Sequence, residues 1–254
     1  MLDIQLTLPP AAREVPQHPA LWRGGDLARM ALPGVATGFA ALDAVLPGGG
    51  WPAASITELM PAHEGIGELR LLGPALAALS REQRHLAWIA PPHLPYAPAL
   101  AAAGIRTAQM VIVRTRSPRE ALWATEQALR SNACGAVLAW PSRETGYTAL
   151  RRLQVAAEGS RALAFLFRSP KAASQPSPAV LRLVLDTDAG GLAVTVAKRR
   201  GAPLAQPVRI AALSRRGRYG ADEIRTSGQA PAGQGRRRLS LAPAPPAKPA
   251  VATP

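Results

Sequence analysis

The stretch from Glu58 to Leu69 constrains this chain most, because it has the outline of a phosphate-binding loop without the residues that bind phosphate. A P-loop follows the pattern G-x-x-x-x-G-K-[ST], in which backbone amides and Lys hold phosphate oxygens and Ser or Thr holds Mg²⁺. Aligned on Gly67, this pattern puts a carboxylate (Glu68) where the cation is needed and a leucine where the hydroxyl is needed. The sequence therefore predicts a vestigial loop that binds no cofactor. Its residues are Ala62, Gly65, Gly67, Glu68 and Leu69.

The segments around this loop follow a defined order. The pattern T-G-x-x-x-L-D-x-x-L begins at Thr37, G-G-x-P ends at Pro52, and I-x-E begins at Ile56, ahead of the loop and a helix. This order and spacing resemble the nucleotide-binding entry of RecA-family recombinases. The resemblance implies an α/β fold with a RecA-like core over residues 34–210, in which helices flank a mostly parallel central sheet.

In RecA-like ATPases the ends of two further strands carry a water-orienting glutamate and a metal-supporting aspartate. Here the matching apolar run 84–90 leads into Pro92, and the matching run 134–140 ends at Trp140. Neither acid is therefore present. His93 has no adjacent Asp or Glu to orient it, and we expect a loop residue rather than a general base. Because three parts of the phosphoryl-transfer machinery are replaced, the sequence predicts no catalytic residue and no enzyme activity.

Hydrophobic periodicity predicts the remaining elements. Helices are expected over 37–46, 69–79, 95–104, 117–131 and 142–158, and strands over 55–59, 84–90, 109–114, 134–140 and 162–167. Alternating apolar positions in 181–185 and 192–196 predict a C-terminal β-hairpin. Ser117, Pro118 and Glu120 form a helix-start signal, and Trp123 lies off the apolar stripe of that helix. Residues 169–178 are expected to form an exposed loop.

The net charge of +14 is unevenly distributed. From Lys198 to the end, twelve Lys and Arg oppose two acidic residues, which places about +10 of the charge there. Such a tail attracts nucleic acid or an acidic partner, or it serves solubility alone in a chain rich in Arg, Ala and Pro. The candidate partner or DNA contacts are Trp22, Lys198, Arg199, Arg200, Arg236, Arg237 and Arg238.

Composition suggests an N-terminal arm over 1–33, the folded domain over 34–210 and a basic, disordered tail over 211–254. No run of about 18 apolar residues occurs, so we expect no membrane span. Cys134 is the single cysteine and the four histidines are scattered, which predicts neither an intrachain disulfide nor a metal site. These features favour a cytoplasmic protein.

Four stretches resemble the ImuA family, RecA-like proteins associated with translesion DNA synthesis. They are Pro19–Gly24, Gly48–Pro52, Glu64–Leu69 and Trp88–Pro92. The resemblance implies a non-catalytic accessory of SOS-linked translesion synthesis and DNA repair. It also implies an ImuB-like, polymerase-related partner, with RecA as a further candidate partner and DNA as a candidate ligand of the basic tail.

Two alternatives remain at this point. Some proteins with this resemblance are named as cell division inhibitors of the SulA type, and such an inhibitor would bind a cytoskeletal GTPase. The other alternative is an ATPase with an atypical P-loop, which would bind nucleotide in spite of Glu68.

Overall fold

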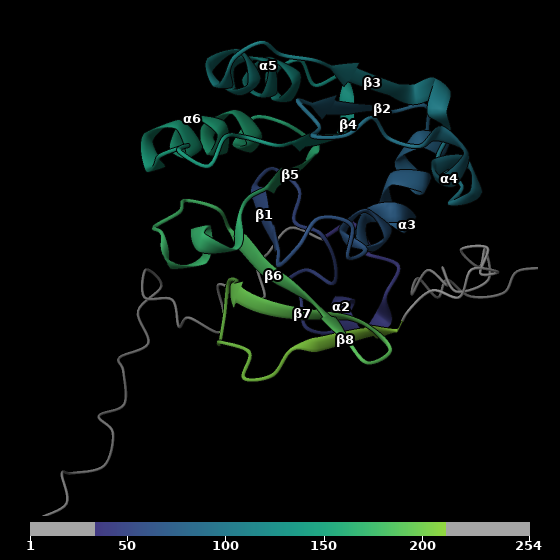
Figure 1. Cartoon of the computed structure of the whole chain (residues 1–254), viewed down its shortest axis with the longest axis vertical. Coiled ribbons are helices and arrows are strands. Elements are labelled where there is room, and N and C mark those ends of the chain that lie inside the picture. Colours follow the sequence, from purple (N-terminus) through teal and green to yellow (C-terminus); the bar gives the residue numbers. More distant parts are fainter. Residues whose placement is uncertain (1–33, 212–254) are drawn as a thin grey trace, which may run out of the picture. The chain divides into compact units, whose positions relative to one another are not determined.

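The computed structural model describes residues 34–211. They form one eight-stranded sheet with the order β3-β2-β4-β5-β1-β6-β7-β8, flanked by helices (Figure 1). The strands are β1 (Ile56–Pro61), β2 (His85–Ile89), β3 (Met110–Val113), β4 (Cys134–Ala139), β5 (Leu163–Phe167), β6 (Leu181–Asp188), β7 (Gly191–Lys198) and β8 (Val208–Ala211). The helices are α2 (Ala40–Asp43), α3 (Glu68–Arg81), α4 (Ala97–Ala102), α5 (Pro118–Arg130) and α6 (Tyr147–Glu158), with 3₁₀ turns η1 (Thr107–Gln109) and η2 (Pro170–Ser174).

Strand β1 lies inside the sheet, between β5 and β6, and pairs with both in parallel. The strands from β3 across to β6 are parallel, whereas β6, β7 and β8 pair antiparallel. This confirms a mixed α/β fold with a mostly parallel sheet and a C-terminal hairpin. Strand β8 extends the sheet beyond the predicted hairpin. It was not predicted, because only Val208 and Ile210 of its four residues point inward.

Two apolar cores lie on opposite faces of the sheet. The first packs α3 against the sheet and continues under β6, β7 and β8. The second lies beneath α5 and α6, which Figure 1 shows together on the other side of the sheet from α3. A parallel sheet covered on both faces explains why its central strands read as continuous apolar runs. None of the helices within 34–211 is long and apolar enough to cross a membrane.

The segment before β1 is fixed by Trp51, which is fully buried and meets the ring of Phe165 edge-on at 5.2 Å. Its backbone exchanges two hydrogen bonds with Val35. Gly50 makes this approach feasible, since a Cβ there would lie 2.2 Å from the Val35 carbonyl oxygen. The helix predicted over 37–46 is shorter in the structure, only α2, and the Asp43 carboxylate accepts the Thr37 amide at 2.8 Å ahead of it.

Two helix starts test the capping rules. Ser117 caps α5 as predicted: its hydroxyl accepts the Glu120 amide at 3.2 Å, while the Glu120 carboxylate accepts the Arg116 amide. Helix α6 begins at Tyr147, five residues later than predicted, and Tyr147 is 52% exposed. The expected arm over 1–33 and all of the tail from residue 212 lie outside the described residues.

Candidate functional site

The Ala62–Leu69 loop joins the carboxyl end of β1 to the start of α3. Gly67 precedes the helix at φ 114°, a left-handed conformation that favours glycine. One side chain of the loop closes it: Glu68 Oε1 accepts the Gly65 amide at 2.9 Å, and Glu68 Oε2 accepts the Gly67 amide at 3.0 Å. A carboxylate of the chain itself therefore holds amides of the kind that a P-loop turns toward phosphate.

The neighbouring strand ends carry aromatic rings instead of acids. Trp140 follows β4, and its ring stacks on those of Trp88 in β2 and Phe167 in β5. The ring centroids are 5.7 Å and 4.4 Å apart, respectively. This row occupies the strand end where a metal-supporting aspartate was sought, and it offers no anionic oxygen to a cation. The row is largely internal, because Trp88 and Phe167 are buried and Trp140 is half-buried.

His93 lies in a loop, as predicted, but an acid does contact it. Its Nε2 lies 2.9 Å from the Glu64 carboxylate, so an acid does stand beside it, 29 residues away in the sequence. Both side chains are largely exposed, 78% and 69%, and a pair in that setting contributes little to stability. The contact links the loop to the segment that follows β2.

A buried ionic cluster was missed by the sequence reasoning. Glu58 in β1 is fully buried, and its carboxylate accepts hydrogen bonds from Arg182 Nε at 2.6 Å, Arg168 at 3.2 Å and Ser177 at 2.9 Å. The two guanidiniums also bind backbone carbonyls, those of Thr145, Ala172 and Ala173. The cluster thereby joins β1, β6 and the η2 turn.

One signal could have revealed this cluster. A charged residue inside an apolar strand must be paired, because burying an unpaired charge is very unfavourable. Glu58 and Arg182 both stand in such strands, and Arg168 directly follows one. Arg168 borders the loop predicted over 169–178, and its side chain is only 3% exposed and bound to Glu58.

The three basic candidates after β7 have different environments. Lys198 Nζ donates to the Ser177 carbonyl at 2.9 Å, and burial, followed by the nearby Arg182 charge, lowers the pKa of Lys198. Arg199 donates to the carbonyls of Ala202 and Val45. Arg200 is exposed. Of the three, Arg200 alone makes no hydrogen bond or ion pair within 34–211. Trp22, Arg236, Arg237 and Arg238 lie outside the described residues.

Comparison with known proteins supports one of these alternatives more than the others. Residues 55–164, from the start of β1 into β5, match the family model described as cell division inhibitor SulA. The cell division inhibitor SulA of Edwardsiella piscicida is 35% identical over 98 residues, which is 39% of this chain and 58% of that protein. The crystal structure of SulA from Pseudomonas aeruginosa is 29% identical, with 46% of this chain and 99% of that chain covered and a TM-score of 0.38.

These matches overturn the resemblance drawn from the motifs. The assignment to the ImuA family, with RecA recombinases as more distant relatives, is wrong, and so is the role in translesion synthesis and DNA repair. The motifs behind it include Gly48–Pro52, which here serves to bring Trp51 beside Val35. The ImuB-like partner, RecA and DNA stay predictions. The chain spans 58% of the length of the curated relative that it matches.

Proposed function

We propose that this protein is a SulA-type inhibitor of cell division that acts by binding a cytoskeletal GTPase of the division machinery, as part of the SOS response. The observation that carries the proposal is the match of residues 55–164 to the SulA family model, together with the 35% identical relative. That range contains β1 to β4, α3 to α6 and the beginning of β5. It is the part of the chain in which the partner surface is to be sought.

The exposed apolar side chains support a protein partner in this range. Every large hydrophobic residue that the described part of the chain exposes lies within 55–164: Leu94, Tyr96, Val111, Ile112, Trp123, Tyr147 and Val155. They come from the segment before α4, from β3, from α5 and from α6. Trp123 on α5 is the strongest anchor among them, because it is 62% exposed and tryptophan is enriched where interfaces concentrate their binding energy.

The protein acts without catalysis in this proposal. The Glu68 carboxylate holds the amides of Gly65 and Gly67, and Trp140 takes the place of a metal-supporting acid. Inhibition then requires binding alone, with no nucleotide turnover. The alternative of an ATPase with an atypical loop has less support, since a nucleotide phosphate would have to displace the Glu68 carboxylate.

For the fold alone, we propose a RecA-like core. The support is the position of the Ala62–Leu69 loop between the inner parallel strand β1 and α3, the connection at which α/β proteins bind phosphate. In this chain the connection is kept as a structural joint.

Expression of the full chain in undamaged cells tests the proposed function. The proposal predicts filamentous cells whose length increases with the amount of protein, because division stops while growth continues. The Trp123→Ala variant should restore normal division at equal protein level, whereas Gln127→Ala, one turn further along the exposed face of α5, should still cause filamentation. Cells of normal length at high wild-type level would contradict the proposal.

A further inference from the structure

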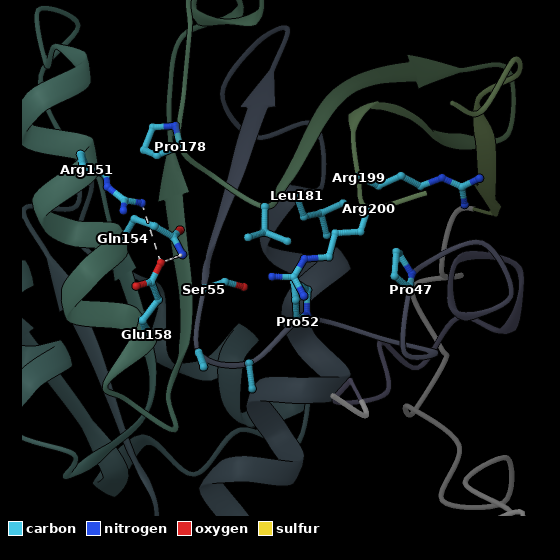
Figure 2. Close-up of a pocket in the computed structure, with 13 residues that line it drawn as sticks. Pro47, Pro52, Ser55, Arg151, Gln154, Glu158, Pro178, Leu181, Arg199 and Arg200 are labelled. Atoms are coloured by element: carbon cyan, nitrogen blue, oxygen red, sulfur yellow. Dashed lines mark hydrogen bonds and ion pairs between the residues drawn. The ribbon is translucent and has the colours of Figure 1, made fainter. Parts of the chain in front are cut away.

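A pocket of about 260 Å³ lies at the amino ends of β1 and β6, the opposite end of those strands from the Ala62–Leu69 loop (Figure 2). The apolar part of its lining includes Pro47, Pro52, Ala53, Pro178, Val180 and Leu181. The rest is polar, with Ser55 between Gln154 and Glu158 of α6 and the arginines that follow β7. Neither the pocket nor a ligand for it enters the proposed function.

Ser55 shows that this pocket is chemically incomplete. The residue is 4% exposed, and its hydroxyl has no hydrogen-bond partner among residues 34–211. A buried hydroxyl without a partner is unfavourable and rare in native proteins. Figure 2 shows this hydroxyl pointing toward the side of the pocket on which the Arg200 guanidinium lies. A ligand that accepts from Ser55 would satisfy it.

The charges of the pocket favour an anion. The pocket is lined by three arginines (Arg151, Arg199 and Arg200) and one acid (Glu158), so its lining carries a net charge of +2. Arg199 points away and is bound to backbone carbonyls, while Arg151 is 3.9 Å from the Glu158 carboxylate. Within 34–211, no hydrogen bond or ion pair engages Arg200, whose guanidinium lies beside Pro52 in Figure 2. Arg200 is therefore the cation available to a ligand.

We propose that this pocket binds a compact carboxylic acid, whose carboxylate accepts from the Ser55 hydroxyl and the Arg200 guanidinium. The apolar body of the ligand packs on Pro52 and Leu181. Glu158 disfavours a doubly charged phosphate, and one free guanidinium matches one carboxylate. The volume of about 260 Å³ is just below the usual range of small-molecule and cofactor pockets, which fits a compact ligand. A free organic acid and the carboxyl terminus of a peptide both carry this group.

Ligand-observed NMR titration of the full chain tests the site. The probes are hexanoate with hexanamide as its neutral match, acetyl-Gly-Leu with a free or an amidated carboxyl end, and inorganic phosphate. Binding of hexanoate or of the free-acid peptide, with at least tenfold weaker binding of the matched amide and of phosphate, is the expected result. If hexanoate binds more tightly, the ligand is a free organic acid; if the free-acid peptide binds more tightly, it is the carboxyl terminus of a peptide. Equal binding of acid and amide, preference for phosphate, or binding of neither carboxylate overturns the proposal.

Three variants connect the binding to the named groups. Arg200→Gln should weaken carboxylate binding about tenfold or more, and Arg143→Gln, an exposed arginine outside the pocket, should leave it unchanged. Ser55→Ala should weaken binding without lowering the melting temperature, because the Ser55 hydroxyl makes no bond within 34–211. If Ser55 had a purely structural role, Ser55→Ala would lower the melting temperature and leave carboxylate binding unchanged. Unchanged affinity in both pocket variants would refute the assignment.

Discussion

The Glu58 carboxylate accepts a hydrogen bond from Arg182 Nε at 2.6 Å between two neighbouring parallel strands, where Glu58 is fully buried and the Arg182 side chain is 8% exposed. Arg168 binds the other carboxylate oxygen at 3.2 Å. Two buried cations thus share one anion, and their remaining donors reach backbone carbonyls. The cluster stabilises the η2 turn against the sheet rather than offering a surface to nucleic acid.

Removing this anion should strongly destabilise the protein. Glu58→Gln keeps the side-chain shape but leaves two buried guanidiniums without a counter-charge, which should lower the free energy of unfolding by about 3–5 kcal/mol. Urea unfolding of the full chain measures the loss. Glu144→Gln, on an exposed residue outside the cluster, is the control and should change stability by less than about 0.5 kcal/mol. Equal stability of the two variants would show that the Glu58 cluster does not stabilise the junction of β1, β6 and η2.

The Glu68 carboxylate should protect the two loop amides that it accepts. In Glu68→Ala, amide hydrogen exchange at Gly65 and Gly67 should become roughly tenfold faster, because a hydrogen bond to a charged group is lost at each amide. The Leu71 amide, which donates to the Gly67 carbonyl within α3, should keep its exchange rate. Glu64→Gln serves as the matched control, since Glu64 bonds to His93 instead. Unchanged exchange at both glycines in Glu68→Ala would contradict the closed loop.

Burial raises the pKa of the Cys134 thiol, and this should appear as a pH dependence of stability. The unfolded thiol ionises near pH 8.5, about its ordinary value. The stabilising contribution of the neutral thiol is therefore complete below that pH and is lost as the pH rises through the raised pKa. The difference in unfolding free energy between wild type and Cys134→Ala should shrink from pH 7.5 to 10. A difference that is constant or grows over this range would refute the assignment.

Trp123 should carry a large share of the binding energy for the proposed partner. Replacing a central aromatic anchor by alanine commonly weakens a protein complex by about 2 kcal/mol or more, which is roughly thirtyfold in Kd. Surface plasmon resonance with the cytoskeletal GTPase measures this change. Because Trp123 is 62% exposed, Trp123→Ala should melt at the wild-type temperature. Full affinity in Trp123→Ala, with Gln127→Ala as the matched control, would place the contact elsewhere in 55–164.

Most strands were predictable because a parallel sheet covered on both faces imposes continuous apolar runs, as in β2, β4 and β5. The end of α6 was predictable because Gly159 follows it, but its start was not: Ser142 and Thr145 resemble a cap, while the helix begins only after Gly146. The edge strand β8 was missed because four residues with two inward side chains give a weak pattern.

The candidate site was predictable only in its local chemistry. The absence of Lys and Ser or Thr at Glu68 and Leu69 is visible in the sequence, but the return of the Glu68 carboxylate to its own loop is not. The pairing of Glu58 with Arg168 and Arg182 spans 110 and 124 residues, and the contact of Glu64 with His93 spans 29. Such long-range pairings depend on strand order, which single-sequence patterns do not specify.

Polymer sedimentation tests directly whether this protein inhibits the division GTPase as a SulA-type inhibitor would. Purified full-length protein is added in increasing amounts to the division GTPase of the same organism, with GTP, and the pelleted polymer is measured. The amount of polymer should fall toward zero as the protein approaches equimolar amounts, whereas Trp123→Ala should leave it largely intact. Undiminished polymer at a molar excess of the wild-type protein would contradict the proposal of a SulA-type inhibitor.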